Sequence, residues 1–284
     1  MASIESKYTE NVKNLVPRPN IALEVLNMAH NLECHFPTLA AKIEKDPNLT
    51  ANMMRLANSA YFGLNSSFSS IHEILIRLGL ETVQILAITG AASGLLSSPQ
   101  QAYNLKPEDL WYHSYATAIL ARIICRYSGV EDKNSAYTAA LLHDIGKVLL
   151  NRPLQIAISD LDSDKKKEFS SEIVLEENLL GTNHARVGRE LLKKWRLPEN
   201  IIEAVGSHHT SPEKHGENGI KMAVFLANYL VGSIGIYSIS EEDYPTFNME
   251  ELLEREESIN YPDELYNNME EIIDEFFNDL HCTA

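Results

Sequence analysis

Two adjacent residues, His143 and Asp144, lie in a long apolar stretch, AALLHDIGKVLL, which also contains Gly146 and Lys147. Charged and metal-ligating side chains in a segment otherwise typical of a buried core cost free energy unless a partner compensates for them. An imidazole nitrogen beside a carboxylate oxygen is a ligand set that Zn, Mn or Fe accepts and that Mg or Ca does not favour. The pattern therefore predicts a transition-metal site with further ligands elsewhere in the chain.

Those further ligands are expected among histidines in similarly apolar, helical surroundings. Four histidines meet this description: His113, His184, His208 and His209. A single histidine among apolar residues is more often a hydrogen-bonded core residue than a ligand. Because the four are far apart in the sequence, four or five helices must converge before they can share a metal ion, as in the core of a helical bundle.

The order of these residues resembles a known family. The series His113, His143-Asp144-x-Gly-Lys147, His184-x-x-x-Gly188 and His208-His209 is similar to the HD superfamily of metal-dependent phosphohydrolases. Upstream, the segments VPRPN, IEKDPNLTANMMRLANSAYFG and SSIHEILIRLGLETVQ resemble the N-terminal half of HDOD domains, the HD-related output domains of bacterial signalling proteins. The resemblance covers roughly residues 10–235. It implies a bacterial cytoplasmic regulatory module, usually without demonstrated catalysis, and it favours a metal site over isolated core histidines.

The resemblance also implies how the ligands are shared. Those implied for a first metal ion are His113, His143 and Asp144. Those implied for a second are His184, His208 and His209, with Asp144 as the bridge. The expected cofactor is a divalent transition metal in a mononuclear or binuclear centre, with Fe, Mn, Zn and Ni as the candidates.

One position departs from the catalytic relatives. They carry an aspartate on a helix after the histidine doublet, and here the matching residue is Asn228, in LANYL. An amide oxygen can coordinate a metal but brings no charge, so the first metal would be held more weakly. The alternative is an amide that is hydrogen-bonded within the core.

Two other features bear on catalysis. If the protein is active, the resemblance makes Asp144 and Lys147 its catalytic residues, and the Lys147 ammonium would neutralise charge developing on a phosphate oxygen. Alternatively, Lys147 extends to the surface at the end of its helix. The doublet is followed by TSPEKHGENG and not by the Gly-Tyr-Pro signature of HD-GYP enzymes, which argues against hydrolysis of a cyclic dinucleotide.

The elements that must position these residues are expected to be helices, because apolar residues recur at helical spacing over most of the chain. The sequence predicts an all-α fold: an HD-domain-like helical bundle with an N-terminal helical HDOD subdomain and an acidic C-terminal helical extension. The predicted domains are residues 1–105 for the N-terminal half, 106–240 for the metal-binding core and 241–284 for the extension.

Local signals predict several helix ends. Ser70 and Glu73 have capping-box spacing ahead of a helix that Gly79 would end. A central helix is expected from about Asn134 to Leu150, followed by an interruption at Asn151–Pro153.

Two candidate ligands are expected near helix starts. Asn183 is predicted to cap a helix with His184 just inside it. Asp109 lies four residues before His113, so the two side chains share a helix face. Asp109 would either orient that imidazole, add an oxygen ligand, or only place a favourable charge in the first turn.

The formal net charge of −16 is concentrated at the C-terminal end. Residues 241–284 hold 15 acidic side chains against one basic, whereas residues 1–240 hold 25 acidic and 23 basic. Phosphate backbones are bound through clustered Lys and Arg, so nucleic acid and an anionic membrane surface are disfavoured as partners. Two amphipathic helices are predicted in this acidic segment, one from Leu252, Leu253 and Ile259 and one from the pattern Leu265, Met269, Ile272, Ile273, Phe276 and Phe277. Disordered acidic segments contain few such side chains, so the segment is expected to pack on the domain or on a partner.

The sequence also favours a cytoplasmic location. The longest uncharged apolar run, Ile85–Leu96, has 12 residues, short of the roughly 20 that a membrane span needs. MASIESKYTE shows no export signal, and the three cysteines have neither disulfide nor metal-site spacing.

Two classes of function remain open. In the first, the protein is a non-catalytic signalling module that binds a signalling protein or a phosphorylated small ligand. In the second, it is a metal-dependent phosphohydrolase or phosphodiesterase. The HDOD resemblance and Asn228 favour the first, while the otherwise full ligand set keeps the second open. A third alternative is an all-helical scaffold whose site is empty.

Overall fold

The computed structural model describes residues 4–9, 20–27, 35–58, 67–161, 169, 171–210, 219–235 and 268–281, and the regular elements in these ranges are helices joined by turns and short loops. Within these ranges no strand occurs, and the only β-type pairing is an isolated bridge between Gln100 and Leu105. The predicted all-α fold is confirmed.

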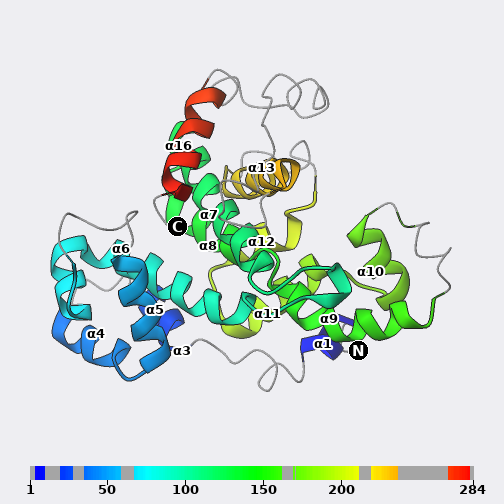
Figure 1. The fold of residues 1–284 in the computed structure, drawn as a ribbon, viewed down its shortest axis with the longest axis horizontal. Helices are drawn as coiled ribbons and strands as arrows, with labels where there is room; N and C mark the ends of the chain where they lie inside the picture. The colour runs from blue at the N-terminus through cyan, green and yellow to red at the C-terminus, as the bar shows by residue number, and fades with distance from the viewer. Residues whose placement is uncertain are drawn as a thin grey trace.

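The helices of the N-terminal half are α1 (Ile4–Thr9), α3 (Asn20–Asn27), α4 (Phe36–Ile43), α5 (Pro47–Ala57) and α6 (Ile71–Leu96). After the short 3-10 helix η2 (Gln101–Tyr103) come α7 (Asp109–Tyr127), α8 (Lys133–Leu142), α9 (Ile145–Ser159), α10 (Glu172–Leu180), α11 (His184–Trp195), α12 (Glu199–Ser207), α13 (Gly219–Ile234) and α16 (Met269–His281). Figure 1 shows α3, α4 and α5 gathered at one end of the molecule, from which α6 extends toward the remaining helices.

Helix α6 joins two hydrophobic cores. Ile74 and Leu86 belong to the smaller core with α3, α4 and α5, whereas Ile88 and Leu96 belong to the larger core around α7 and α8. Because both cores include residues of this one helix, the predicted boundary at residue 105 stays a prediction. The boundary at residue 240 lies outside the described residues.

The start of α6 follows its sequence signal, with one difference. Ser70 Oγ accepts a hydrogen bond from Glu73 N at 3.1 Å, but the Glu73 carboxylate accepts from Ser69 N, not from Ser70 N. Gly79 was predicted to end this helix, and the backbone does leave helical geometry there. With φ 80° and ψ 174°, Gly79 ends a first helical segment, and a second segment follows at once and continues to Leu96, so that α6 is two helices joined at a kink.

By length and composition, α6 is the one helix among the described residues that could cross a membrane. The uncharged run Ile85–Leu96 covers only the last part of α6, whereas the whole helix also includes the preceding turns, which contain charged residues. Within its most apolar part, 56% is buried inside the protein. A long core helix has the same length and composition.

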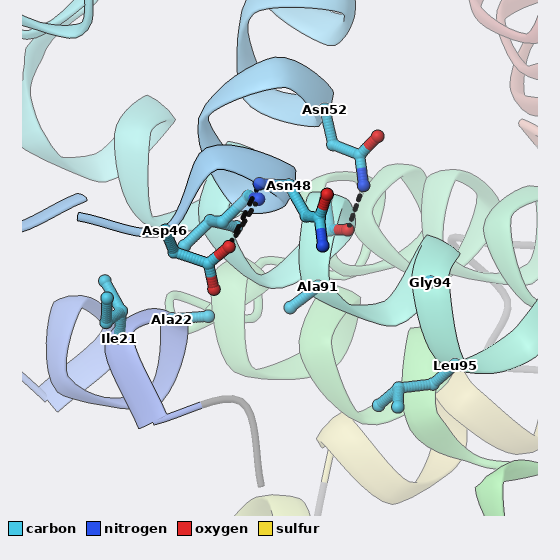
Figure 2. A pocket seen from close by; sticks show the side chains of 10 residues that line it. Ile21, Ala22, Asp46, Asn48, Asn52, Ala91, Gly94 and Leu95 are labelled. Atoms are coloured by element: carbon cyan, nitrogen blue, oxygen red, sulfur yellow. Dashed lines mark hydrogen bonds between the residues drawn. The ribbon is translucent and has the colours of Figure 1, made fainter. Parts of the chain in front are cut away.

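A pocket of about 240 Å³ lies between α3, α5 and α6 (Figure 2). Gly90, Ala91 and Gly94 on α6 leave this space because their side chains are small or absent. Asn52 Nδ2 donates to the Gly90 carbonyl oxygen at 3.0 Å, and Asp46 accepts from the first backbone N–H groups of α5. At the edge of the pocket, Asn52 therefore ties α5 to α6, and Asp46 caps the start of α5.

The predicted central helix is two helices. Helix α8 ends at Leu142 and α9 begins at Ile145, so that His143 and Asp144 form the turn between them. The prediction of one helix from Asn134 to Leu150 was therefore wrong. The interruption expected at Asn151–Pro153 was also wrong, because α9 continues through Pro153 to Ser159. A proline in a helix removes one backbone hydrogen bond, and here the helix tolerates that loss.

The amphipathic helix expected near the C-terminus is α16, which packs on α7 (Figure 1). Ile272, Ile273 and Phe276 are buried in the larger core, and Arg126 of α7 forms an ion pair with Glu275. This helix therefore packs on the domain, which was one of its two expected packing partners. The other helix expected in the acidic segment, around Leu252–Ile259, lies outside them.

Helices α9 and α11 cross at two glycines. A Cβ on Gly146 would lie 2.0 Å from the His184 carbonyl oxygen, and one on Gly188 would lie 3.5 Å from Gly146 N. Any side chain at Gly146 would force the helices apart, because the obstructing atom is backbone. This close approach brings the start of α11 beside the His143-Asp144 turn.

Gly146→Ala is expected to lower the free energy of unfolding by about 3 kcal/mol, at the upper end of overpacking effects. It should also weaken metal binding, since Asp144 and His184 lie on opposite sides of the crossing. Chemical denaturation and metal titration measure the two effects. Gly232→Ala is the control, because a Cβ on this helical glycine would meet nothing within 4 Å and alanine favours helix. Equal stability of the two variants would contradict the packing argument.

Candidate metal centre

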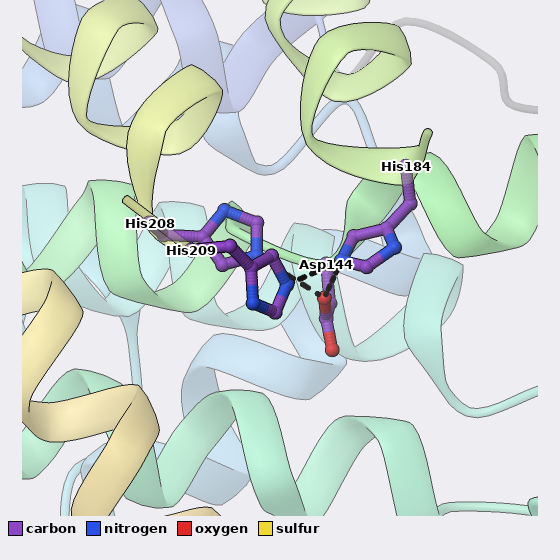
Figure 3. Close-up of side chains that lie close together, drawn as sticks. All are labelled: Asp144, His184, His208 and His209. Atoms are coloured by element: carbon purple, nitrogen blue, oxygen red, sulfur yellow. Dashed lines mark hydrogen bonds and ion pairs between the residues drawn. The ribbon is translucent and has the colours of Figure 1, made fainter. Parts of the chain in front are cut away.

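The structure brings the six predicted histidine and aspartate ligands together. Their donor atoms form two groups, each within 4.8 Å and each containing Asp144. The first group is His113, His143 and Asp144, and the second is Asp144, His184, His208 and His209. Figure 3 shows the second group, with histidines from two helix ends directed at the carboxylate. This is the grouping that the resemblance implied, although its role as a ligand set remains a prediction.

Most of these side chains lie at helix termini. His143 and Asp144 form the α8–α9 turn, His208 is the residue at which α12 ends, and His184 is the first residue of α11. The predicted cap of α11 is confirmed, because the Asn183 side chain accepts a hydrogen bond from Arg186 N.

Asp144 is the centre of the cluster and is only 2% exposed. Its Oδ1 lies 3.1 Å from His184 Nε2 and 3.7 Å from His208 Nε2. Its Oδ2 lies 2.9 Å from Lys147 Nζ and 3.4 Å from His143 Nε2. One buried carboxylate thus faces three imidazoles and an ammonium.

Hydrogen bonds at the far side of two rings decide which nitrogen can bind a metal. His143 Nδ1 lies 2.6 Å from the Ala140 carbonyl oxygen, and His208 Nδ1 lies 2.6 Å from the Val205 carbonyl oxygen. A carbonyl only accepts, so each Nδ1 carries the proton and each neutral ring has its lone pair at Nε2. Both Nε2 atoms are buried and make no hydrogen bond to any described residue.

This arrangement fits a divalent transition metal. Two Nε2 lone pairs and a carboxylate oxygen are all acceptors, so they are a poor match for one another in a buried site without a cation. Nitrogen and carboxylate donors together suit Mn, Fe, Zn or Ni better than Mg or Ca. The orphaned Nε2 atoms are the observation on which this fit rests.

A residue that the sequence did not predict orients His184. Both oxygens of Glu176, on α10, lie 2.9 Å from His184 Nδ1, and Oε2 also accepts from His184 N at 2.7 Å. Tyr103 OH donates to Oε1 at 2.6 Å. Glu176 is fully buried. A carboxylate behind a histidine fixes its ring and raises its basicity as a ligand. In the sequence, the only sign of this contact was that Glu176 lies eight residues before His184.

The charge state follows from these contacts. Burial alone would raise the pKa of Asp144, but the positive charges of Lys147 and His184 hold it well below its usual range. Burial would lower the pKa of His184, and the carboxylates of Asp144 and Glu176 outweigh burial and raise it to about 9.

Two other imidazoles of the cluster are held neutral. Burial lowers the pKa of His208 to about 4 and that of His113 to about 3. Neutral rings are the form that can donate a lone pair to a metal ion.

His209 closes the cluster on its solvent side. Its side chain is exposed, and its Nε2 lies 2.9 Å from His184 Nε2. Two imidazole nitrogens at this separation need a shared proton or cation between them. His209 is therefore placed to reach the same ion as His184.

Lys147 does not extend to the surface. It is 8% exposed, and its ammonium lies 2.9 Å from Asp144 Oδ2 and 2.8 Å from Glu172 Oε2. Burial would lower its pKa, but the two carboxylates raise it above the ordinary value, so the side chain stays charged. The surface alternative from the sequence was wrong for this residue.

Asn228 lies beside the first group of ligands. Its Oδ1 is 3.1 Å from His113 Nε2, a hydrogen-bond distance. An amide oxygen only accepts, so this contact places a proton on Nε2 of His113. The geometry therefore fits the alternative in which the Asn228 amide is hydrogen-bonded within the core. The same amide oxygen could also coordinate a metal ion.

Asp109 takes the simplest of its three predicted roles. Its Oδ2 accepts a hydrogen bond from Lys106 N at 2.7 Å, at the start of α7. It therefore stabilises the first turn.

Comparison with known proteins assigns the family. The family model of the HDOD domain matches residues 15–211, and the chain belongs to the HDOD family. An uncharacterized protein from Treponema pallidum is 25% identical over 210 residues, which cover 74% of this chain and 40% of that protein. The chain thus spans well under half the length of that relative.

Solved structures have the same fold. An HDOD domain protein of unknown function from Geobacter sulfurreducens superposes with a TM-score of 0.75 at 24% identity, covering 98% of this chain and 96% of that chain. A candidate phosphohydrolase from Shewanella amazonensis gives 0.73 at 19% identity, covering 97% and 96%. The predicted HDOD resemblance is confirmed, and at these identities the structures speak for the fold alone.

Glu176→Gln is expected to weaken metal affinity by about 10- to 100-fold, because the amide no longer provides the negative charge that orients His184 and increases its basicity. Isothermal titration with Mn²⁺ or Zn²⁺ measures the change. Glu190→Gln removes a carboxylate that pairs with Lys193 on α11 and is the control, with little change expected. Unchanged affinity in Glu176→Gln would show that this carboxylate serves packing alone.

Proposed function

We propose that this chain is a bacterial signal-transduction module in which the His/Asp cluster binds one or two divalent transition-metal ions. The module acts by binding a signalling protein or a phosphorylated small ligand, without strong catalysis. The observation that carries the proposal is the convergence of the His143 and His208 Nε2 atoms, neither hydrogen-bonded, on the buried Asp144 carboxylate.

The two groups of ligands are unequal, and this favours binding over catalysis. The group of Asp144 with His184, His208 and His209 has one carboxylate and three imidazoles. In the other group, the contact of His113 with the neutral Asn228 occupies one imidazole nitrogen. A second ion would therefore share the one carboxylate of Asp144 and have fewer imidazole ligands than the first.

A metal-dependent phosphohydrolase is the second candidate, and Lys147 is the observation that favours it. Its buried ammonium lies beside Asp144, where it could neutralise a phosphate oxygen. A bound divalent ion would act there as a Lewis acid. The likeness in fold to candidate phosphohydrolases is compatible with this function but does not carry it.

The charge distribution supports the proposed partners. Residues 241–284 carry most of the net charge of −16 and would repel phosphate backbones and anionic membrane surfaces, and the nearly neutral remainder offers them no excess of basic side chains. We therefore propose a protein partner or a small ligand that reaches Lys147, in the cytoplasm, and not nucleic acid or membrane.

Protein purified without chelator is expected to contain Mn, Fe, Zn or Ni, and added metal should raise its melting temperature. Asp144→Ala should lose the metal because it removes the oxygen donor common to both groups. Elemental analysis and thermal unfolding measure this, with Asp274→Ala, an exposed carboxylate on α16, as the control. An empty site whose melting temperature ignores added metal would contradict the proposal. Phosphoester turnover that Asp144→Ala abolishes would favour the second candidate.

Asn228→Asp is expected to strengthen the weaker group, because it adds a charged oxygen beside His113. Mn²⁺ titration should show a second binding event that tightens by about tenfold or more. Asn178→Asp adds the same charge on an exposed face of α10 and should leave metal binding unchanged. If Asn228→Asp lowers stability with no gain in metal binding, the amide serves only to hold His113.

A further inference from the structure

A second carboxylate lies at the solvent side of Lys147. Glu172 is the first residue of α10, and its Oε2 is 2.8 Å from Lys147 Nζ. The Glu172 side chain is 48% exposed, whereas the Asp144 side chain on the other side of the ammonium is 2% exposed. Lys147 is thus held between one buried carboxylate and one that faces water.

We infer that Glu172 occupies the position at Lys147 where an anionic oxygen of a phosphorylated ligand would bind, and so sets the affinity of the site for phosphate. The inference rests on the proposed function for its ligand class. An ammonium has three donors and no acceptor. Asp144 and Glu172 take two of them, and only Glu172 lies toward solvent, from which a ligand must arrive.

The two carboxylates differ in how readily they can leave. Asp144 is buried and faces His143, His184 and His208, and moving it would leave those buried rings without their carboxylate partner. Among the described residues, the ion pair with Lys147 is the only one that Glu172 makes. A rotation of the Glu172 side chain into water is therefore enough to free the ammonium.

Helix α10 need not move for this exchange. Glu176 lies one turn after Glu172 and is fully buried between Tyr103 and His184. Residues four apart share a helix face, so the buried carboxylate fixes the helix while the exposed one stays at its edge. The same helix thus orients a metal ligand with one carboxylate and covers Lys147 with the other.

The test is the affinity for inorganic phosphate, measured by isothermal titration on the full chain, with metal content determined separately. Glu172→Gln should bind phosphate about three- to tenfold more tightly, the range expected when a partly exposed ion pair no longer competes. Glu190→Gln is the matched control, because it removes the same charge from an exposed Glu–Lys pair, with Lys193 Nζ at 3.0 Å. Its phosphate affinity should change less than twofold.

A double variant links the gain to the ammonium. The double variant Glu172→Gln, Lys147→Met should lose the gain in phosphate affinity, and circular dichroism checks that it is folded. If it does not fold, Glu172→Asp replaces it: this variant keeps the negative charge, so its phosphate affinity should be close to that of wild type. Equal affinity in Glu172→Gln and wild type, a gain matched by Glu190→Gln, or a gain that survives without Lys147 would overturn the inference. Metal content should be the same in Glu172→Gln and wild type. Absence of metal from every variant would count against the proposed function, while the phosphate series would still decide the role of Glu172.

Discussion

The buried carboxylate of Asp144 is the constraint on which the rest of the site depends. Moving an ionised carboxylate out of water costs several kcal/mol even after the protein relaxes, roughly the scale of a whole domain's stability. The chain meets that cost with Lys147 at 2.9 Å and with imidazoles on three helix ends. A cation bound among them would offset it further, which is why so many ligating groups can be tolerated in a core.

The helix termini supply the geometry. The last carbonyl groups of a helix and its first N–H groups lack partners within the helix. Ala140 and Val205 carbonyl oxygens belong to the last turns of α8 and α12, and the Nδ1 atoms of His143 and His208 donate to them. The first N–H of α11, that of His184, donates to Glu176. The same groups that complete the helix ends thus fix the rings with Nε2 toward Asp144.

The sequence predicted the residue types of the site better than it predicted their surroundings. The histidines, Asp144 and the cap at Asn183 are visible because they interrupt an apolar helical pattern or begin one. Glu176 and Glu172 were missed, since a glutamate in a helix has no local feature that separates a buried partner from a solvated one. Their roles depend on where α10 packs, which local spacing does not encode.

The same limit explains the wrong helix boundaries. The stretch from Asn134 to Leu150 is helical in pattern throughout, so its periodicity alone indicates one helix. The break at His143-Asp144 is favoured by the tertiary contacts of these two residues and by the close crossing at Gly146, neither of which periodicity contains. Gly146 itself could be recognised as part of a motif, but its physical reason, the carbonyl of His184 lying 2.0 Å from a Cβ, appears only in three dimensions.

The centre is also joined to the N-terminal half of the fold. Thr89 of α6 and Tyr137 of α8 share a hydrogen bond of 2.9 Å between buried hydroxyl groups. Tyr137 lies six residues before His143 on the helix that ends at the site, and Thr89 lies on the helix shared by both cores. Both hydroxyls are buried, so separating α6 from α8 would break a hydrogen bond that water is poorly placed to replace. The position of α8, and with it that of His143 and Asp144, is therefore held by the N-terminal half as well as by the helices that carry the other ligands.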